Sequence, residues 1–141
     1  MAFHKATESV RNIAPQPIEN RLKTNPFFAE IVIVGNRRNF PAALVVPNFE
    51  ALEGWARQKG VPFASREALI QRPEVVALYE KLIHEMTPDL AQFEKIKKIA
   101  LLPREFTLEA GELTPTLKVK RSVVEEKFKD VIDRLYGGAA A

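Results

Sequence analysis

Two apolar runs separated by a short turn constrain the fold of this chain more than any other feature. Ile31–Val34 is an unbroken β-branched run, and Pro41–Val46 is a second apolar run that ends at Pro47. Residues 35–39 between them are rich in glycine, asparagine and arginine, which favours a turn. We therefore expect an antiparallel hairpin over residues 28–46. Because neither run alternates with polar residues, both faces of this hairpin should be at least partly covered.

Helical spacing of apolar residues marks most of the remaining chain. A third strand is expected over residues 99–107, where Pro103 favours an edge or a bend. The pattern predicts an α+β fold, in which a small mixed sheet of about three strands packs against four to five helices. The antiparallel hairpin and the third strand would form that sheet. The segments with helical character are 17–24 beginning at Pro17, 49–58 after Asn48, 65–71, 73–86, a further stretch to about 97 after a break or a new start at residues 87–89, and 121–135.

The composition argues against several classes of function. The 141 residues are a normal size for one domain and contain no cysteine, which excludes disulfides, thiolate zinc sites and cysteine catalysis. His4 and His84 are far apart in the sequence, which argues against a Ser-His-Asp triad, and we expect no metal site. The formal net charge of +3 suits an anionic ligand without requiring nucleic acid, and Arg37-Arg38 lacks the aromatic neighbours of a nucleic-acid contact. No apolar run of 18 residues and no signal peptide occur, so we expect no transmembrane segment and a cytoplasmic location.

The stretch Glu112–Arg121 is the strongest candidate for a functional site. Pro115 fixes its own φ and pushes Thr114 toward an extended conformation, so Lys118 is expected on an exposed, semi-rigid loop. A lysine presented in this way is a candidate contact for an anionic group such as phosphate. The alternative is a solvated, lysine-rich start of a helix. These residues alone do not define a reaction.

Three motifs in this order resemble the C-terminal part of adenylate-forming acyl-CoA synthetases, and of their long-chain fatty acid branch in particular. Asn12–Asn20 is similar to the segment that follows the hinge of these enzymes, where an apolar–x–Pro–x–x–Ile–Glu pattern recurs. Ala42–Pro47 followed by Phe49–Leu52 resembles the same branch. Leu113–Arg121 resembles its version of the terminal catalytic-lysine motif, which reads Ser-Gly-Lys-apolar-x-Arg in other branches. The match covers residues 12–136.

The resemblance implies that this chain is the small mobile lid of a larger enzyme. Lys118 takes the position of the catalytic lysine, which reaches the acyl carboxylate and the α-phosphate while acyl-adenylate forms. Thr114, Thr116 and Arg121 complete the motif around it. The large N-terminal adenylation domain would be the partner, and the parent enzyme would use ATP, Mg²⁺ and CoA to convert a fatty acid into acyl-CoA. This domain alone should bind no cofactor and have no ligase activity, and any membrane association would come through the parent enzyme.

In the family a second face of the lid lines the path of the pantetheine thiol, and the resemblance assigns Arg11, Asn12, Pro15 and Glu19 to this face. The preceding residues depart from the family pattern, because no glycine is present and Arg11 stands where a lysine is usual. We assign residues 12–138 to the lid and 139–141 to a tail. Residues 1–11 form an N-terminal arm, which we expect to be disordered or foreign to the family. The alternative function is a stand-alone binding or regulatory module that acts in trans on a separate adenylating subunit.

Overall fold

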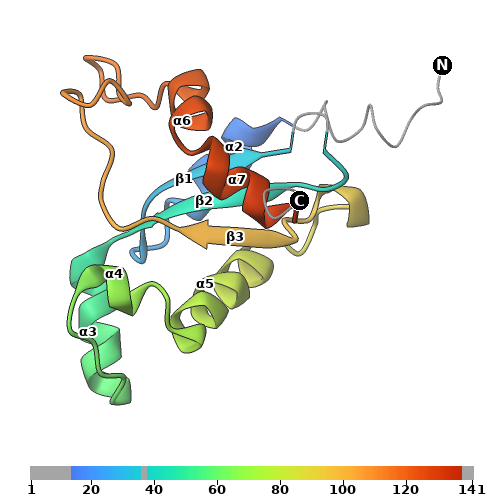
Figure 1. Ribbon diagram of the computed structural model, residues 1–141. Helices are drawn as coiled ribbons and strands as arrows, with labels where there is room; N and C mark the ends of the chain where they lie inside the picture. Colours follow the sequence, from blue (N-terminus) through green and yellow to red (C-terminus); the bar gives the residue numbers. More distant parts are fainter. Residues whose placement is uncertain (1–13, 36–37, 138–141) are drawn as a thin grey trace, which may run out of the picture.

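A three-stranded sheet forms the centre of the molecule in the computed structural model, which describes residues 14–35 and 38–137 (Figure 1). The strands are β1 (Phe28–Val34), β2 (Ala42–Pro47) and β3 (Lys98–Leu101). The described residues also form α2 (Pro15–Leu22), α3 (Phe49–Lys59), α4 (Arg66–Leu69), α5 (Pro73–Met86), α6 (Arg121–Lys127), α7 (Lys129–Leu135) and the short 3₁₀ helix η1 (Gln92–Glu94).

The sheet is mixed, with strand order β1-β2-β3. β1 and β2 are antiparallel, with Ile31 opposite Val45, which confirms the predicted hairpin. β2 and β3 are parallel. Every residue of β2 is buried, because helices cover both of its faces and a strand lies on each side of it. The unbroken apolar run of β2 therefore follows from its central position.

Two hydrophobic clusters lie on opposite faces of the sheet, because successive side chains of a strand point to opposite sides. One cluster joins alternate sheet residues such as Ile31 and Val45 to α2, α3 and α5. The other joins their neighbours Val32 and Leu44 to Val124 of α6 and to α7. Figure 1 shows the resulting layers, with α6 and α7 on one side of the sheet and α3, α4 and α5 on the other. The α+β fold predicted from the sequence is confirmed.

The N-terminal helix begins earlier than predicted. α2 starts at Pro15, not at Pro17, and Gln16 is helical. Both prolines fall within the first turn, where backbone N–H groups have no partner inside the helix. Two prolines at this spacing therefore do not exclude a helix when they stand at its start.

Two later predictions are wrong in detail. The helix predicted over residues 73–86 ends at Met86, and Thr87 donates from Oγ1 to the carbonyl of Ile83 at 2.7 Å. The further helical segment predicted to reach about residue 97 is wrong. Only η1 follows α5 before β3. The third strand ends at Leu101 and does not continue to residue 107, because Pro103 has no N–H to donate to a ladder. The chain after Pro103 instead forms a long segment of turns that ends at α6.

The C-terminal helix is divided at Phe128 into α6 and α7. Phe128 has φ −107° and ψ 24°, outside helical values, and its ring packs 6.1 Å from that of Phe106. With this break, Val124 of α6 and Ile132 of α7 both lie in the same hydrophobic cluster. The helix ends before Gly137, whose φ of 74° is in the left-handed region.

Candidate functional site

Lys118 lies on a small β-hairpin, here called the lysine hairpin and defined as residues 112–120. Leu113 and Val119 form an isolated antiparallel bridge. The Lys120 N–H donates to the Glu112 carbonyl at 2.8 Å, and the Thr114 N–H donates to the Lys118 carbonyl at 2.8 Å. The expected exposed, semi-rigid loop is therefore a hydrogen-bonded hairpin.

The tip of the lysine hairpin is held by Thr114. Its carbonyl accepts the Leu117 N–H at 2.7 Å, and its Oγ1 accepts the Lys118 N–H at 3.0 Å. The hydroxyl groups of Thr114 and Thr116 are 3.0 Å apart. Pro115 occupies the second position of this four-residue turn, which its fixed φ favours. Each motif residue at the tip thus has a structural task that keeps the backbone of Lys118 in place.

Leu117 adopts φ 65° and is the only non-glycine residue in the described ranges with a positive φ. A turn followed by one left-handed residue is a common three-residue hairpin loop, and glycine is the usual occupant of that last position. Leu117 also exposes 66% of its surface. The position immediately before Lys118 therefore combines backbone strain with an exposed apolar side chain.

The Lys118 side chain is exposed, and within residues 14–35 and 38–137 no carboxylate pairs with its ammonium group. By contrast, Lys127 and Arg121 on either side of the hairpin are both engaged in ion pairs. The Lys118 ammonium group therefore extends into solvent from a backbone that is held by hydrogen bonds, where it can contact an anionic group.

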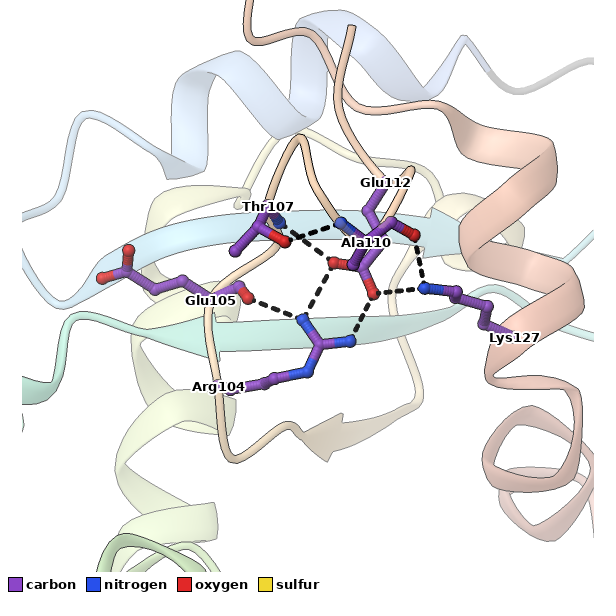
Figure 2. Close-up of polar contacts among 6 residues, drawn as sticks. All are labelled: Arg104, Glu105, Thr107, Ala110, Glu112 and Lys127. Atoms are coloured by element: carbon purple, nitrogen blue, oxygen red, sulfur yellow. Dashed lines mark hydrogen bonds and ion pairs between the residues drawn. The ribbon is translucent and has the colours of Figure 1, made fainter.

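A buried carboxylate holds the base of the lysine hairpin. Glu112 has no exposed surface and accepts two hydrogen bonds from the Arg104 guanidinium, at 2.9 and 2.6 Å. It also accepts the Thr107 N–H at 3.0 Å and lies 3.4 Å from Lys127 Nζ. Figure 2 shows these groups converging on the Glu112 carboxylate from the loop and from α6. The Arg104 hydrogen bonds hold the pKa of Glu112 below its usual value, although burial opposes this effect.

A second ion pair anchors the chain immediately after the hairpin. Arg121 donates to both carboxylate oxygens of Glu19 at 2.9 and 2.8 Å, and to the carbonyl of Ile33 at 3.0 Å. Glu19 in turn accepts the Ile33 N–H at 2.7 Å. The hydrogen bonds to Glu19 raise the pKa of Arg121 further above its usual value. The start of α6 is thereby tied to α2 and β1.

A hollow of about 320 Å³ brings several of the predicted residues together. It is lined by Lys118 and Arg121 from the C-terminal motif and by Glu19 from α2. Gln16 and Asn20 of α2, together with Lys23 directly after it, complete one wall, and residues 30–32 of β1 lie beneath it. The N-terminal and C-terminal motifs are therefore neighbours in space. The hollow is mostly polar and lies directly beside Lys118, which suits an anionic or polar ligand.

The residues predicted for the CoA face differ in their accessibility, and two of them lie outside the described residues. Pro15 is the half-buried first residue of α2. Glu19 is buried, and both of its oxygens are occupied by the Arg121 pair, so its contact with CoA stays a prediction. Arg11 and Asn12 lie outside the described residues, as do the arm and the tail assigned to residues 1–11 and 139–141.

Sequence reasoning did not find the cluster of Arg104, Glu112 and Lys127. Each residue is an ordinary charge in a chain with 21 basic and 18 acidic side chains, and none belongs to a motif used for the family resemblance. The one signal in the sequence was that an acidic residue, Glu112, directly precedes the apolar residue Leu113. A carboxylate in such a position either faces solvent or is buried against a cation.

The sequence profile described as "AMP-binding enzyme C-terminal domain" matches residues 7–140, which is nearly the whole chain. The chain belongs to this family. Among curated relatives, the long-chain-fatty-acid–CoA ligase FadD15 of Mycobacterium tuberculosis is 37% identical over 131 residues. That alignment covers 92% of this chain and 22% of the relative. Long-chain-fatty-acid–CoA ligase 1 of Cavia porcellus is 34% identical, with 88% of this chain and 18% of the relative covered. This AMP-binding C-terminal domain thus spans about a fifth of the length of these relatives.

Solved structures show the same fold at lower identity. The A domain of carboxylic acid reductase from Segniliparus rugosus, in complex with AMP and a co-purified carboxylic acid, aligns with a TM-score of 0.68 and 21% identity. That alignment covers 88% of this chain and 18% of the reductase chain. The adenylation domain of a carboxylate reductase from Mycobacterium chelonae gives a TM-score of 0.67 and 23% identity, covering 86% of this chain and 17% of the other. The AMP-binding C-terminal domain fold therefore occurs as a small part of larger adenylating proteins.

In the ranges 14–35 and 38–137, no helix has the length and apolar character needed to cross a lipid bilayer. In the same ranges, no three histidine or acidic side chains gather where they could bind a metal ion.

Proposed function

We propose that this AMP-binding C-terminal domain is the mobile lid of a fatty acid–CoA ligase and that Lys118 is its catalytic residue. The named activities of the M. tuberculosis and Cavia porcellus relatives support a fatty acid as the substrate class. Because the chain spans only about a fifth of these relatives, the substrate, ATP, Mg²⁺ and CoA are assigned to the complete ligase. The adenylation domain that precedes the lid in such a ligase is its partner.

The observation that carries the proposal is the presentation of Lys118. Its backbone is fixed by the lysine hairpin, while its side chain is exposed and pairs with no carboxylate in the described ranges. A lysine with a purely solubilising role needs no such frame. A cation that must meet a reacting anion benefits from one, because a preorganised charge loses little freedom during the reaction.

The chemistry of adenylation explains why a cation is needed. When a carboxylate attacks the α-phosphate of ATP and displaces pyrophosphate, two anionic groups are brought together, and negative charge accumulates on the equatorial phosphoryl oxygens and on the leaving oxygen. The Lys118 ammonium would stabilise this charge electrostatically and would orient the carboxylate, with no proton transfer required. Closure of the lid would bring the lysine to the reactants and exclude water at the same moment.

The second orientation of the lid is assigned to the thioester-forming step, with the start of α2 facing CoA. Pro15 lies at this position and is partly accessible, whereas the buried Glu19 would act there only by holding α2 against β1. Lys118 is not needed in this step, since the adenylyl group is already on the acyl carboxylate and the thiol attacks the acyl carbon, which releases AMP. The two half-reactions should therefore depend on different parts of the same domain.

A chimeric ligase tests the proposal. This chain would replace the matching 131-residue segment of FadD15, and acyl-CoA formation from a long-chain fatty acid, ATP and CoA would be measured. We expect activity from the chimera and none from the 141-residue chain alone. FadD15 truncated before this segment is the control, and it should be inactive or strongly impaired. A folded chimera without activity, or acyl-CoA formation by the isolated chain, would contradict the proposal.

A further inference from the structure

We infer that Glu112 is a positioning residue for Lys118, acting through the base of the lysine hairpin. The inference rests on the proposed role of Lys118. Glu112 does not face the hollow beside Lys118, and its carboxylate points into the protein toward Arg104 and Lys127 (Figure 2). It would therefore act on the reaction only through the position of the hairpin.

Four donor groups surround this one carboxylate. Arg104 supplies two N–H groups, the Thr107 backbone supplies a third, and Lys127 approaches at 3.4 Å. The two cations are fixed in turn, because Arg104 also donates to the Glu105 carbonyl at 2.8 Å and Lys127 donates to the Ala110 carbonyl at 2.6 Å. A fully buried carboxylate with this many partners has one position of low energy.

The position of Glu112 is passed to Lys118 through the backbone. The Glu112 carbonyl accepts the Lys120 N–H at 2.8 Å, which is the first rung of the hairpin, and the Leu113–Val119 bridge is the next. The Thr114–Lys118 hydrogen bond completes the ladder directly at the lysine. Leu117 at the tip adopts a strained φ of 65°, which persists only when the surrounding structure determines it. A loosened base would therefore allow the tip to relax and Lys118 to move.

The carboxylate also connects separate elements. Arg104 and Thr107 belong to the loop after β3, and Lys127 is the last residue of α6. Together with the Arg121–Glu19 pair on the other side of the hairpin, this arrangement holds the ten residues 112–121 at both ends. The lysine hairpin thus projects from two charged anchors and needs no large apolar core of its own.

Hydrogen exchange on the 141-residue chain tests the mechanical part of this inference. Glu112→Gln preserves the shape but turns one acceptor into an NH₂ group that faces the donors of Arg104 and Lys127. We expect the Lys120 and Thr114 amides to exchange at least tenfold faster, because the hairpin opens locally. The Leu102 amide, which donates to Val45 in the sheet at 2.8 Å, should change much less.

Glu53→Gln is the matched control. Glu53 is also a carboxylate with two cationic partners, Arg57 at 3.8 Å and Arg66 at 3.2 Å, but it lies on α3, remote in sequence from the hairpin. Its replacement should leave the Lys120 and Thr114 amides unchanged. If Glu112→Gln fails to fold, Lys127→Met replaces it, because Arg104 still neutralises Glu112 in that variant. The same amides should then exchange faster by a smaller factor.

The half-reactions of the chimeric ligase test the functional part. Glu112→Gln should slow fatty-acid-dependent ATP–pyrophosphate exchange at least tenfold and alter thioester formation from preformed acyl-adenylate by no more than about twofold. A merely structural role would lower both half-reactions together. Equal losses in both, or unchanged exchange of the Lys120 and Thr114 amides, would overturn the inference. If Lys118→Ala itself leaves adenylation intact, the proposed function fails instead, and the two failures are thereby distinguished.

Discussion

Glu19 and Arg121 are separated by 102 positions in the sequence, and their side chains meet in a two-pronged ion pair with N–O distances of 2.9 and 2.8 Å. Only 8% of the Glu19 side chain is exposed. The pair joins α2, the first helix of the described residues, to Arg121, the last residue of the motif that contains Lys118. It explains why two motifs at opposite ends of the chain lie beside one hollow.

This pair should contribute strongly to stability. Glu19→Gln leaves Arg121 without its counter-charge in a partly buried site, and we expect the free energy of unfolding to fall by at least about 2 kcal/mol. Urea unfolding of the isolated chain would measure the change. Asp89→Asn, which breaks the exposed Arg21–Asp89 pair, is the control and should have a much smaller effect. Equal changes in the two variants would contradict this account.

Leu117 should be replaceable by glycine with a gain in stability. Glycine removes the strain of a left-handed backbone, and little apolar burial is lost because Leu117 is already 66% exposed. We expect Leu117→Gly to be more stable than Leu117→Ala by about 1 kcal/mol, since alanine keeps the Cβ that causes the strain. Thermal or urea unfolding of both variants measures the difference. An alanine variant as stable as the glycine variant would show that the strain is not there.

Glu112 should make the stability of the chain depend on acid pH. Its pKa is held below the ordinary value of 4.5, chiefly by the Arg104 hydrogen bonds, so the unfolded chain takes up a proton at Glu112 before the folded chain does. The stabilisation is therefore fully present above about pH 4.5 and is lost as the pH falls through the lower, folded-state pKa. Urea midpoints between pH 7 and pH 3 should fall more steeply in the wild type than in Glu112→Gln. Parallel curves would contradict the assignment.

The two tyrosines of the chain should both resist ionisation. The Tyr79 hydroxyl donates to the Phe27 carbonyl at 2.7 Å, and burial raises its pKa. Burial likewise raises the pKa of Tyr136 to about 12, although the nearby Arg38 opposes this, and its hydroxyl donates to the Phe40 carbonyl. Ultraviolet titration should show almost no tyrosinate at pH 10 in the folded chain and normal ionisation in urea. Half-ionisation near pH 10 without urea would contradict the burial of both rings.

The sequence was most informative where one local property decided the outcome. The runs at 31–34 and 41–46 predicted the hairpin and its covered faces, because unbroken β-branched and apolar residues have few other stable arrangements. Pro115 similarly indicated an exposed loop at Lys118. The predicted start at Pro17 is wrong because proline fits any position of the first helical turn, so both Pro15 and Pro17 fall inside α2.

Contacts between distant residues could not be predicted in the same way. Glu19 and Arg121 belong to motifs that carry the family resemblance, and Glu112 is an ordinary acidic residue of the sequence, but the partners of all three depend on how the helices and the loop after β3 pack against the sheet. A charge in a chain rich in both signs has many possible partners, and the choice is made by tertiary geometry. The role of Glu112 as an anchor therefore became apparent only in the structure.

The separation of the two half-reactions by Lys118→Ala in the chimeric ligase tests the central claim most directly. Lys118→Ala should reduce ATP–pyrophosphate exchange by roughly 10²–10³-fold, the usual cost of removing one group that stabilises transition-state charge. Thioester formation from preformed acyl-adenylate should change no more than about twofold. Lys120→Ala, which removes an exposed lysine two positions away, should leave both half-reactions near wild type. Equal losses in both half-reactions for Lys118→Ala, or equal effects of the two lysine variants, would contradict the assignment of Lys118 as the adenylating lysine.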